Sequence, residues 1–448
     1  MGDPDAGLSF GALLRGWRKR ALLTQEQLAE RAGLNVRTVR RLENDGLGQP
    51  RTASIVLLAR ALALDRGERA LLAAATRAPS APAAAAAPGP PATVPRQLPA
   101  DVAALEGRGR ELAIVAGHRS ATTVPVVSIT GMAGTGKTAL AVHAAHRLAP
   151  QYPDGQLFVD LHGHDRAAAP VEPGAALARV LGAFGVPGEQ VPARLDDRAA
   201  LYRSVLAGRR VLIVLDDATG EQQVQPLLPG CPDCRVIVTS RRGLVCPGDA
   251  RDLSLDVLPV ADAVALFVRM AGRERVAGTP PVVLAETVRR CGLLPLAIRV
   301  AAARLRAHPS WDVRHLLGRL AADRLAELRA GRHSVAAALD LSYERLPADH
   351  RRAYRLLGSC VRAEFGLDVA AVLLDTTAAR AGGLLARLLD AHLLQEPAPG
   401  RYRFHGLVRE HATELRRRTW VPLTWVARSA ESNIALFHDI AGIYSGVE

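Results

Sequence analysis

The stretch GMAGTGKT (131–138) decides the central part of the fold. It has the pattern G-x-x-x-x-G-K-[ST], and it lies between an apolar run at 124–130 and a helical stretch at 138–149. Glycines at these positions let backbone N–H groups turn toward phosphate, and the following helix dipole adds attraction. The residues predicted to contact a nucleotide here are Gly131, Met132, Ala133, Gly134, Thr135, Gly136, Lys137, Thr138 and Ala139.

Side chains within this loop have separate predicted roles. Lys137 supplies a positive charge to the β- and γ-phosphates, and Thr138 supplies an oxygen ligand to Mg²⁺. The only lysines in the chain are Lys19 and Lys137, so one of the rare lysines lies where the pattern requires an ammonium. The predicted cofactors are therefore ATP or ADP together with Mg²⁺.

Two further apolar runs end in polar residues that suit the same site. VLIVLDD (211–217) predicts a buried strand that delivers Asp216, as a second Mg²⁺ ligand, and Asp217, which orients or deprotonates a water. The alternative is that both aspartates merely end a strand and begin a turn. VIVTSRR (236–242) ends in Arg241, which is placed to sense a γ-phosphate. His162 and His164 follow another apolar run; a solvated loop is the favoured prediction, and an approach to the nucleotide is the alternative.

The chain has 448 residues, and this length suggests roughly three domains. Apolar runs alternate with helical stretches up to about residue 255, and this pattern predicts an α/β unit with a parallel sheet. Beyond it the sequence is helical except near Tyr402–Phe404. The expected fold is thus multidomain. Its predicted parts are an all-α DNA-binding domain (1–77), a Pro/Ala-rich linker (78–103), the P-loop domain (104–255), a helical subdomain (256–330), a second, winged-helix subdomain (331–418) and a tail of unknown role (419–448).

The segment TQEQLAERAGLNVRTVRRLE (24–43) predicts two short helices joined by a glycine turn, which is a helix-turn-helix. Thr24 and Gln27 form a capping-box pattern, and Gly33 suits a left-handed turn. The second helix presents arginines that match guanine edges and phosphates. The predicted DNA-contacting residues are Gln25, Asn35, Val36, Arg37, Thr38, Arg40 and Arg41, and the alternative is a solvated arginine-rich face.

Composition narrows the function classes. The net charge of +13 favours polyanionic partners such as double-stranded DNA. Five cysteines in so long a chain do not suggest a disulfide framework. No apolar run approaches the ~18 residues of a membrane span, and no secretory signal is recognisable. The sequence therefore predicts a cytoplasmic protein without membrane contact, associated with the nucleoid when bound to DNA.

These motifs together resemble known families. Gln25–Ala29, Ala32–Leu34 and Arg41–Asn44 resemble the XRE/Cro type of helix-turn-helix over about residues 9–75. The order GMAGTGKT, FVDLHG (158–163), VLIVLDD, VIVTSRR and CGLLPLA (291–297) resembles the NB-ARC module of STAND-type signalling ATPases, as found in actinomycete transcriptional regulators. This second likeness covers about residues 104–415.

The resemblance implies further roles. Arg108 lies near the adenine, Pro295 packs on it from the helical subdomain, and His405 touches the ADP β-phosphate in a closed state. Lys137, Asp216, Asp217 and Arg241 form the hydrolytic set. The family carries an aspartate after the histidine, whereas this chain has Gly406, so the closed state loses one expected contact.

We therefore expect an ATP/ADP-switched transcriptional regulator that self-associates with ATP and uses slow hydrolysis as a reset. Related proteins place a repeat-rich sensor after the winged helix, so three alternatives stay open: sensing through a separate, unknown sensor protein, sensing through the tail, or a shortened form of the family. One alternative is a defence or signalling scaffold in which the helix-turn-helix is an interaction module. A second is a constitutive repressor in which the nucleotide is structural. DNA target, signal, direction of regulation and oligomer number do not follow from the sequence.

Overall fold

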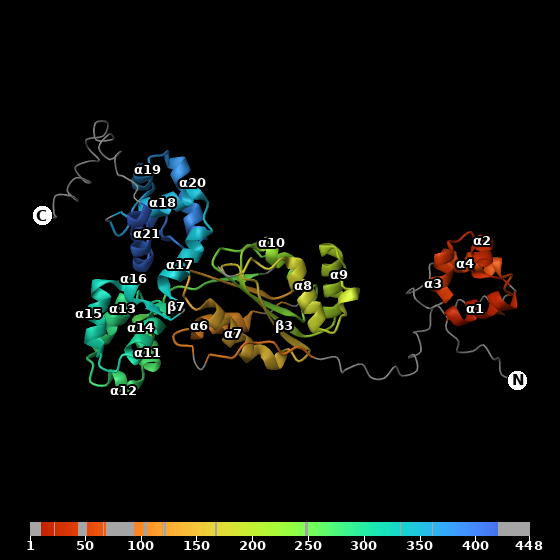
Figure 1. The fold of residues 1–448 in the computed structure, drawn as a ribbon, viewed down its shortest axis with the longest axis horizontal. Helices are drawn as coiled ribbons and strands as arrows, with labels where there is room; N and C mark the ends of the chain where they lie inside the picture. Colours follow the sequence, from red (N-terminus) through yellow and green to blue (C-terminus); the bar gives the residue numbers. More distant parts are fainter. Residues whose placement is uncertain are drawn as a thin grey trace. The chain divides into compact units, whose positions relative to one another are not determined.

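The structure of the chain is a computed structural model, and its parts are described separately (Figure 1). It describes residues 10–21, 23–43, 52–65, 67–68, 94–102, 105–118, 120, 122–165, 168–246, 250–331, 333–360 and 362–419. These residues belong to two compact units, 1–91 and 92–448. Most of the predicted linker and the predicted tail after residue 419 lie outside the described residues.

The first unit is a set of short helices, as the sequence predicts. They are α1 (Phe10–Arg20), α2 (Gln25–Ala32), α3 (Val36–Glu43) and α4 (Thr52–Ala61). Thr24 caps α2, and both hydrogen bonds of the capping box with Gln27 are present. Gly33 ends α2 with a φ of 64°, a left-handed conformation that favours glycine. The sequence-based prediction of a helix-turn-helix is therefore confirmed.

The core of this unit is small and contains a buried ion pair. Leu14, Leu28 and Val39 are fully buried and pack together. Arg18 in α1 contacts Glu43 in α3, with 2.5 Å between Arg18 Nε and Glu43 Oε1, and the Glu43 side chain has no exposed surface. The pair fastens α1 to the end of α3.

The second unit is built on a five-stranded parallel sheet of order β2-β3-β4-β1-β5. The strands are β1 (Val126–Thr130), β2 (Gly155–Asp160), β3 (Val211–Ala218), β4 (Arg235–Ser240) and β5 (Arg251–Ser254). The apolar runs predict the first four. They miss β5, because this edge strand buries only Leu253 and lacks an apolar run.

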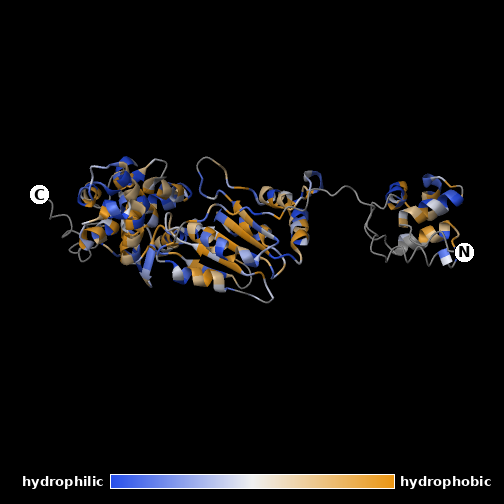
Figure 2. Ribbon diagram, turned by 90° about the horizontal axis from the view of Figure 1, so that it is seen from below, coloured by the Kyte–Doolittle hydropathy of each residue, from blue (hydrophilic) through white to orange (hydrophobic). Residues whose placement is uncertain are grey.

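Alternation along the strands divides the core into two layers. Val127, Ile129 and Val214 pack against α6 (Gly109–Gly117) and α7 (Lys137–Leu148). Ile213, Leu215 and neighbours on the opposite face pack against α8 (Pro173–Ala183) and α9 (Leu195–Leu206). Figure 2 shows the apolar strands between these helices. The short elements of this region are η1 (Ala149–Gln151), η2 (Gly188–Gln190), α10 (Glu221–Val224) and η3 (Gln225–Leu227).

The end of the predicted linker belongs to the second unit. Gln156 N donates to Pro95 O at 2.7 Å and Gln97 N donates to Gln156 O at 2.8 Å, so residue 96 bridges to the edge strand β2. His143 Nδ1 on α7 lies 3.0 Å from Asp101 Oδ1. The prediction of a linker up to residue 103 is therefore wrong for residues 94–102, which pack on the α/β core. The sequence did not predict this packing, because in residues 94–102 isolated apolar side chains alternate with prolines and form no apolar run.

A helical region follows the sheet, as predicted. Its first helices are α11 (Val260–Ala271), α12 (Arg273–Val276), α13 (Pro281–Arg290), α14 (Pro295–Ala307), α15 (Val313–Ala322) and α16 (Arg324–Glu327). After the two-residue strands β6 (Arg329–Ala330) and β7 (His333–Ser334) come α17 (Val335–Glu344), α18 (Ala348–Leu357), α19 (Leu367–Leu374), α20 (Ala378–Asp390), the hairpin β8 (Gln395–Ala398) and β9 (Arg401–Arg403), and α21 (Gly406–Thr419). One apolar cluster runs through both sets and reaches Met132 of the P-loop.

Among the described residues, no single helix is long and apolar enough to span a membrane. The helices α19 and α20 are long and apolar enough only when taken together, and the chain bends by 100° between them.

Candidate nucleotide site and DNA-binding face

The P-loop follows β1 and begins α7, at the carboxyl edge of the sheet. Gly131, Gly134 and Gly136 have φ values of 142°, 85° and 93°, conformations that L side chains rarely adopt. Lys137 Nζ donates to the carbonyls of Gly131 at 2.8 Å and Met132 at 2.9 Å. Burial lowers the pKa of Lys137 to about 7, with a further contribution from Arg241 and opposition from Asp217 and Asp216. A phosphate anion here would favour the charged form of Lys137.

Thr138 and Asp216 meet at the same edge. Thr138 Oγ1 donates to Asp216 Oδ1 at 2.9 Å, and Thr239 Oγ1 donates to the same carboxylate oxygen at 2.6 Å. Burial raises the pKa of Asp216, while these hydroxyls oppose the rise. A hydroxyl and a carboxylate in contact are the hard oxygen ligands that Mg²⁺ prefers. The donor set therefore fits the predicted magnesium ion.

Asp217 is held by a histidine that the sequence predicts to be solvated. His164 N donates to Asp217 Oδ2 at 2.6 Å, and His164 Nδ1 lies 3.0 Å from Asp217 Oδ1. The expectation of a solvated loop is wrong for His164, whose side chain is only 4% exposed. Burial lowers the pKa of His164 against the pull of Asp217. For Asp217, burial acts upward, but His164 and Arg241 outweigh it and leave the pKa lowered.

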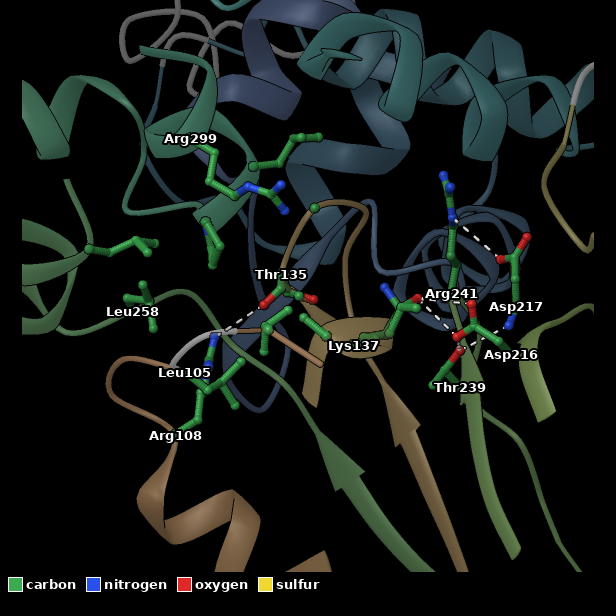
Figure 3. Close-up of a pocket in the computed structure, with 18 of the residues that line it drawn as sticks. Leu105, Arg108, Thr135, Lys137, Asp216, Asp217, Thr239, Arg241, Leu258 and Arg299 are labelled. Atoms are coloured by element: carbon green, nitrogen blue, oxygen red, sulfur yellow. Dashed lines mark hydrogen bonds and ion pairs between the residues drawn. The ribbon is translucent and has the colours of Figure 1, made fainter. Parts of the chain in front are cut away.

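Arg241 joins the α/β core to the helical region. Its Nη1 donates to Ala338 O in α17 at 2.7 Å, while its Nε lies 3.8 Å from Asp217 Oδ1. Its side chain is 17% exposed and lines the P-loop cavity. Figure 3 shows Arg241 extending from the group formed by Asp216, Asp217 and Thr239. The guanidinium therefore lies where strands and α17 meet.

The other wall of the cavity comes from the segment that precedes α6, from α11 and from the start of α14. Arg108 Nη2 donates to Asp256 O at 2.6 Å and approaches Thr135 O at 3.4 Å, so Arg108 supports the P-loop rather than projecting freely. Leu296 N donates to Gly134 O at 3.1 Å, which attaches the start of α14 to the P-loop. Pro295 lines the cavity beside it.

The cavity has a volume of about 730 Å³, which suits a nucleotide-sized ligand. The residues that line it and that the sequence reasoning missed include Leu105, Leu258, Leu266, Met270, Arg269 and Arg299. Figure 3 shows Arg299 approaching Thr135 from the helical side. The spacing Pro295 to Arg299 is one helical turn on α14, a signal that places both on one face. The apolar lining from α11 had no motif to mark it.

His405 lies at a different place. Its Nε2 is 2.9 Å from Gly292 O, and it lines a separate cavity with Asp256, Arg324 and Glu410. Gly292 has a φ of 62°, and a Cβ there would lie 2.5 Å from His405 Cε1. The structure therefore does not bring His405 into the P-loop cavity, contrary to the role that the family resemblance implies.

The helix-turn-helix presents some of its predicted DNA contacts and engages others internally. Arg37 and Arg41 are exposed on α3, and Thr38 is half-buried. Asn35 caps α3 through Oδ1, which accepts from Arg37 N at 2.9 Å. Gln25 donates to the buried Glu43 at 2.7 Å, and Arg40 pairs with Glu26. Val36 is half-buried against the core.

Comparisons with known proteins agree with the first unit and with the regulator class. Residues 9–72 match a family described as helix-turn-helix domain. The chain is 45% identical over 335 residues to the regulatory protein AfsR of Streptomyces coelicolor, covering 72% of this chain and 33% of the relative. It is 44% identical over 337 residues to AfsR of Streptomyces griseus, covering 74% and 34%. The chain thus spans about a third of the length of these relatives.

Solved structures are more distant. A STAND protein with a tetratricopeptide repeat sensor from Pyrococcus horikoshii is 19% identical with a TM-score of 0.34, covering 70% of this chain and 43% of that one. The Aeropyrum pernix ORC2 protein is 13% identical with a TM-score of 0.43, covering 72% and 96%. Similarity at these TM-scores is too low to assign a role.

Proposed function

The chain joins a helix-turn-helix domain to a P-loop NTPase module, and from this premise we propose that it is a nucleotide-switched transcriptional regulator. ADP holds the helical region against the α/β core. Exchange for ATP and Mg²⁺ releases that region, favours self-association and pairs the helix-turn-helix domains on DNA. We assign the core to the NB-ARC type, with α17–α21 and the β8–β9 hairpin as its winged-helix part.

The observation that carries this proposal is the position of Arg241. The same guanidinium lines the nucleotide cavity and donates to Ala338 O in α17. A γ-phosphate is a doubly anionic acceptor that competes with a neutral carbonyl for this donor, because hydrogen bonds between charged groups are roughly twice as strong. Recruitment of Arg241 by ATP therefore costs the contact with α17 and loosens the helical region.

The roles of the other groups follow from their contacts. Lys137, Thr138 and the P-loop amides bind the phosphates, and Thr138 with Asp216 holds Mg²⁺, which neutralises phosphate charge. Asp217, oriented by His164, accepts a proton from the attacking water. Leu258, Leu266 and Pro295 pack on the base. Hydrolysis returns Arg241 to α17 and resets the switch.

DNA contact is assigned to α3. Arg37 and Arg41 are exposed and donate to base edges or phosphates, while Arg40 must first leave Glu26. The helix-turn-helix of the described residues is sized for one half-site, which favours dimeric binding to two half-sites. Assembly of the cores raises the effective concentration of the second domain.

The test compares DNA affinity in defined nucleotide states. Whole chain is loaded with ADP or with a non-hydrolysable ATP analogue and Mg²⁺, and binding to genomic operator fragments is measured between about 50 and 200 mM salt. The ATP-like state is expected to bind more tightly and to sediment as an oligomer. Lys137→Ala should abolish this difference, whereas Arg37→Ala/Arg41→Ala should weaken DNA binding in both states.

The matched control is Arg60→Ala, an exposed arginine of α4 outside the recognition helix. Equal DNA affinity with either nucleotide would refute the switch. DNA binding that is absent at low salt, with nucleotide exchange intact, would favour the scaffold alternative in which the helix-turn-helix contacts protein.

A further inference from the structure

A second, smaller cavity adjoins the nucleotide site. Its volume is about 110 Å³. His164 and Arg241 line both cavities, so they form the wall between them. The remaining polar lining comes from the ends of β3 and β4 and from α17 and α20: Thr219, Arg242, Ser342, Arg345 and Arg387. The cavity therefore lies between the α/β core and the helical region.

The charge in this cavity is one-sided. Four guanidinium groups, those of Arg241, Arg242, Arg345 and Arg387, line it, and the lining contains no carboxylate. Among the described residues, no hydrogen bond or ion pair involves the guanidinium of Arg242, Arg345 or Arg387. Arg241 is the exception, because its Nη1 donates to Ala338 O and, at 3.4 Å, to Ser342 Oγ, and its Nε lies near Asp217.

Nearby groups compensate this charge only in part. Asp217 faces Arg241, and Asp390 and Glu221 act on Arg242 from outside the lining. Burial lowers the pKa of Arg241, and the charge of Arg345 adds to this effect. Burial likewise lowers the pKa of Arg242, with a contribution from Arg387. The cations thus repel one another across the junction of core and helical region.

We propose that this cavity is a binding site for a small oxoanion, inorganic phosphate, held by Arg242, Arg345 and Arg387 with the Ser342 hydroxyl beside them. Guanidinium forks match the oxygen geometry of a phosphate and form charge-assisted hydrogen bonds with it. Because Arg242 follows β4, Arg345 follows α17 and Arg387 lies in α20, one anion would link all three elements. The site is separate from the γ-phosphate position of the proposed nucleotide cleft, and phosphate would stabilise the closed arrangement.

The test measures binding of inorganic phosphate to the whole chain by titration calorimetry in chloride buffer. One titration uses the ADP-loaded protein, and a second uses protein loaded with a non-hydrolysable ATP analogue, which fills the γ-phosphate position. One phosphate per chain is expected in the ADP state. Arg345→Gln/Arg387→Gln should weaken it by about tenfold or more, because a hydrogen bond to a charged group is worth at least that factor.

The control variant is Arg380→Gln, which removes an exposed arginine of the same helix α20 that pairs with Asp349. It should bind phosphate as the parent chain does. A parallel measurement of the unfolding temperature keeps the test valid if calorimetric heats are small: phosphate should raise it in the parent and in Arg380→Gln, and not in the double variant.

Unchanged phosphate affinity in Arg345→Gln/Arg387→Gln would overturn the proposal, as would absence of saturable binding. A third result would also overturn the proposal: phosphate binds every variant in the ADP state, and the ATP analogue displaces it completely. The phosphate would then occupy the nucleotide cleft. Failure of the proposed switch is seen separately, as DNA affinity that does not depend on nucleotide.

A separate experiment determines where the bound phosphate comes from. Protein given ATP labelled at the terminal phosphate is desalted rapidly after hydrolysis. Label that stays with the parent chain and is lost from the double variant supports the site and identifies the adjoining cleft as the source. Binding of added phosphate without retained label supports the site with solvent phosphate as the source.

Discussion

Gly406→Asp should tighten the junction between the two helical parts. Gly406 begins α21, and a Cβ there would lie 3.5 Å from Arg324 Nη2 in α16, an ordinary contact distance. Arg324 Nε already donates to Glu410 Oε1 in α21 at 2.8 Å. The new carboxylate would therefore reach a guanidinium that already links α16 to α21.

The magnitude follows from exposure. The Arg324 and Glu410 side chains are 20% and 39% exposed, so a second pair with the same guanidinium is worth only about 0.2–1 kcal/mol. An acid in the first turn of α21 adds about 0.3–1 kcal/mol through the helix dipole. Since Arg324 is shared with Glu410, we expect a gain below the middle of the combined range, about 1 kcal/mol in all, or about fivefold.

Two assays on the whole chain measure this gain. The rate of release of a fluorescent ADP analogue reports opening of the helical region, and urea unfolding reports the free energy of unfolding. Gly406→Asn is the matched control, because it has the same shape and the same loss of backbone freedom without the charge. Gly406→Asp should release the analogue about fivefold more slowly than Gly406→Asn.

Equal release rates and equal unfolding free energies for Gly406→Asp and Gly406→Asn would refute the reasoning. The negative charge would then not interact with Arg324, and a glycine rather than an aspartate at position 406 would not change how firmly the helical region closes.

Three other predictions concern groups that the structure places in defined surroundings. Burial and the charge of Lys137 lower the pKa of His392 to about 4, so as the pH falls the imidazole is protonated in the unfolded chain before it is protonated in the folded one. The free energy of unfolding should therefore fall as the pH drops from about 6.5 to 4, by up to about 1.4 kcal/mol per pH unit. His392→Gln should remove that part of the pH dependence, as measured by urea unfolding at a series of pH values. Glu43→Ala should destabilise the N-terminal unit by about 3 kcal/mol, seen as an earlier transition in whole-chain calorimetry, because it leaves a cation without its buried partner; an unshifted transition would contradict this. His164→Asn should slow ATP hydrolysis by releasing Asp217 while leaving nucleotide affinity within about twofold, checked by single-turnover assays and equilibrium titration.

Strand ends could be predicted from the sequence because they follow from local patterns. Thr138 and Asp216 lie after buried apolar runs, and parallel strands bring their carboxyl ends to one edge. Contacts that depend on strand order could not be predicted. His164 reaches Asp217 because β2 and β3 are neighbours in the sheet. The order of the motifs along the chain does not reveal which strands pair.

The helical region illustrates a second limit. The resemblance assigned His405 to the phosphate, but a histidine at the end of a strand takes whichever acceptor its surroundings offer, and here the Gly292 carbonyl is 2.9 Å away. Which loop approaches it depends on how α13 and α14 pack on the P-loop. Arg299 was within reach of sequence reasoning, since it shares a helix face with Pro295, whereas the cavity lined by Arg345 and Arg387 exists only after α17 and α20 dock.

Among the described residues, the apolar wall of the nucleotide cavity is continuous with the hydrophobic cluster that fills the helical region. Leu258 and Met132 are buried members of that cluster, and Leu266, Met270 and Leu296 pack against it while also facing the cavity. A purine ring seated there would complete the interior much as a missing side chain would. Nucleotide at about 100 times its Kd would add about 2.7 kcal/mol to the stability. Removal of the nucleotide should therefore lower the stability of the folded chain, and with it the yield and solubility, so purification should keep nucleotide present from lysis onward.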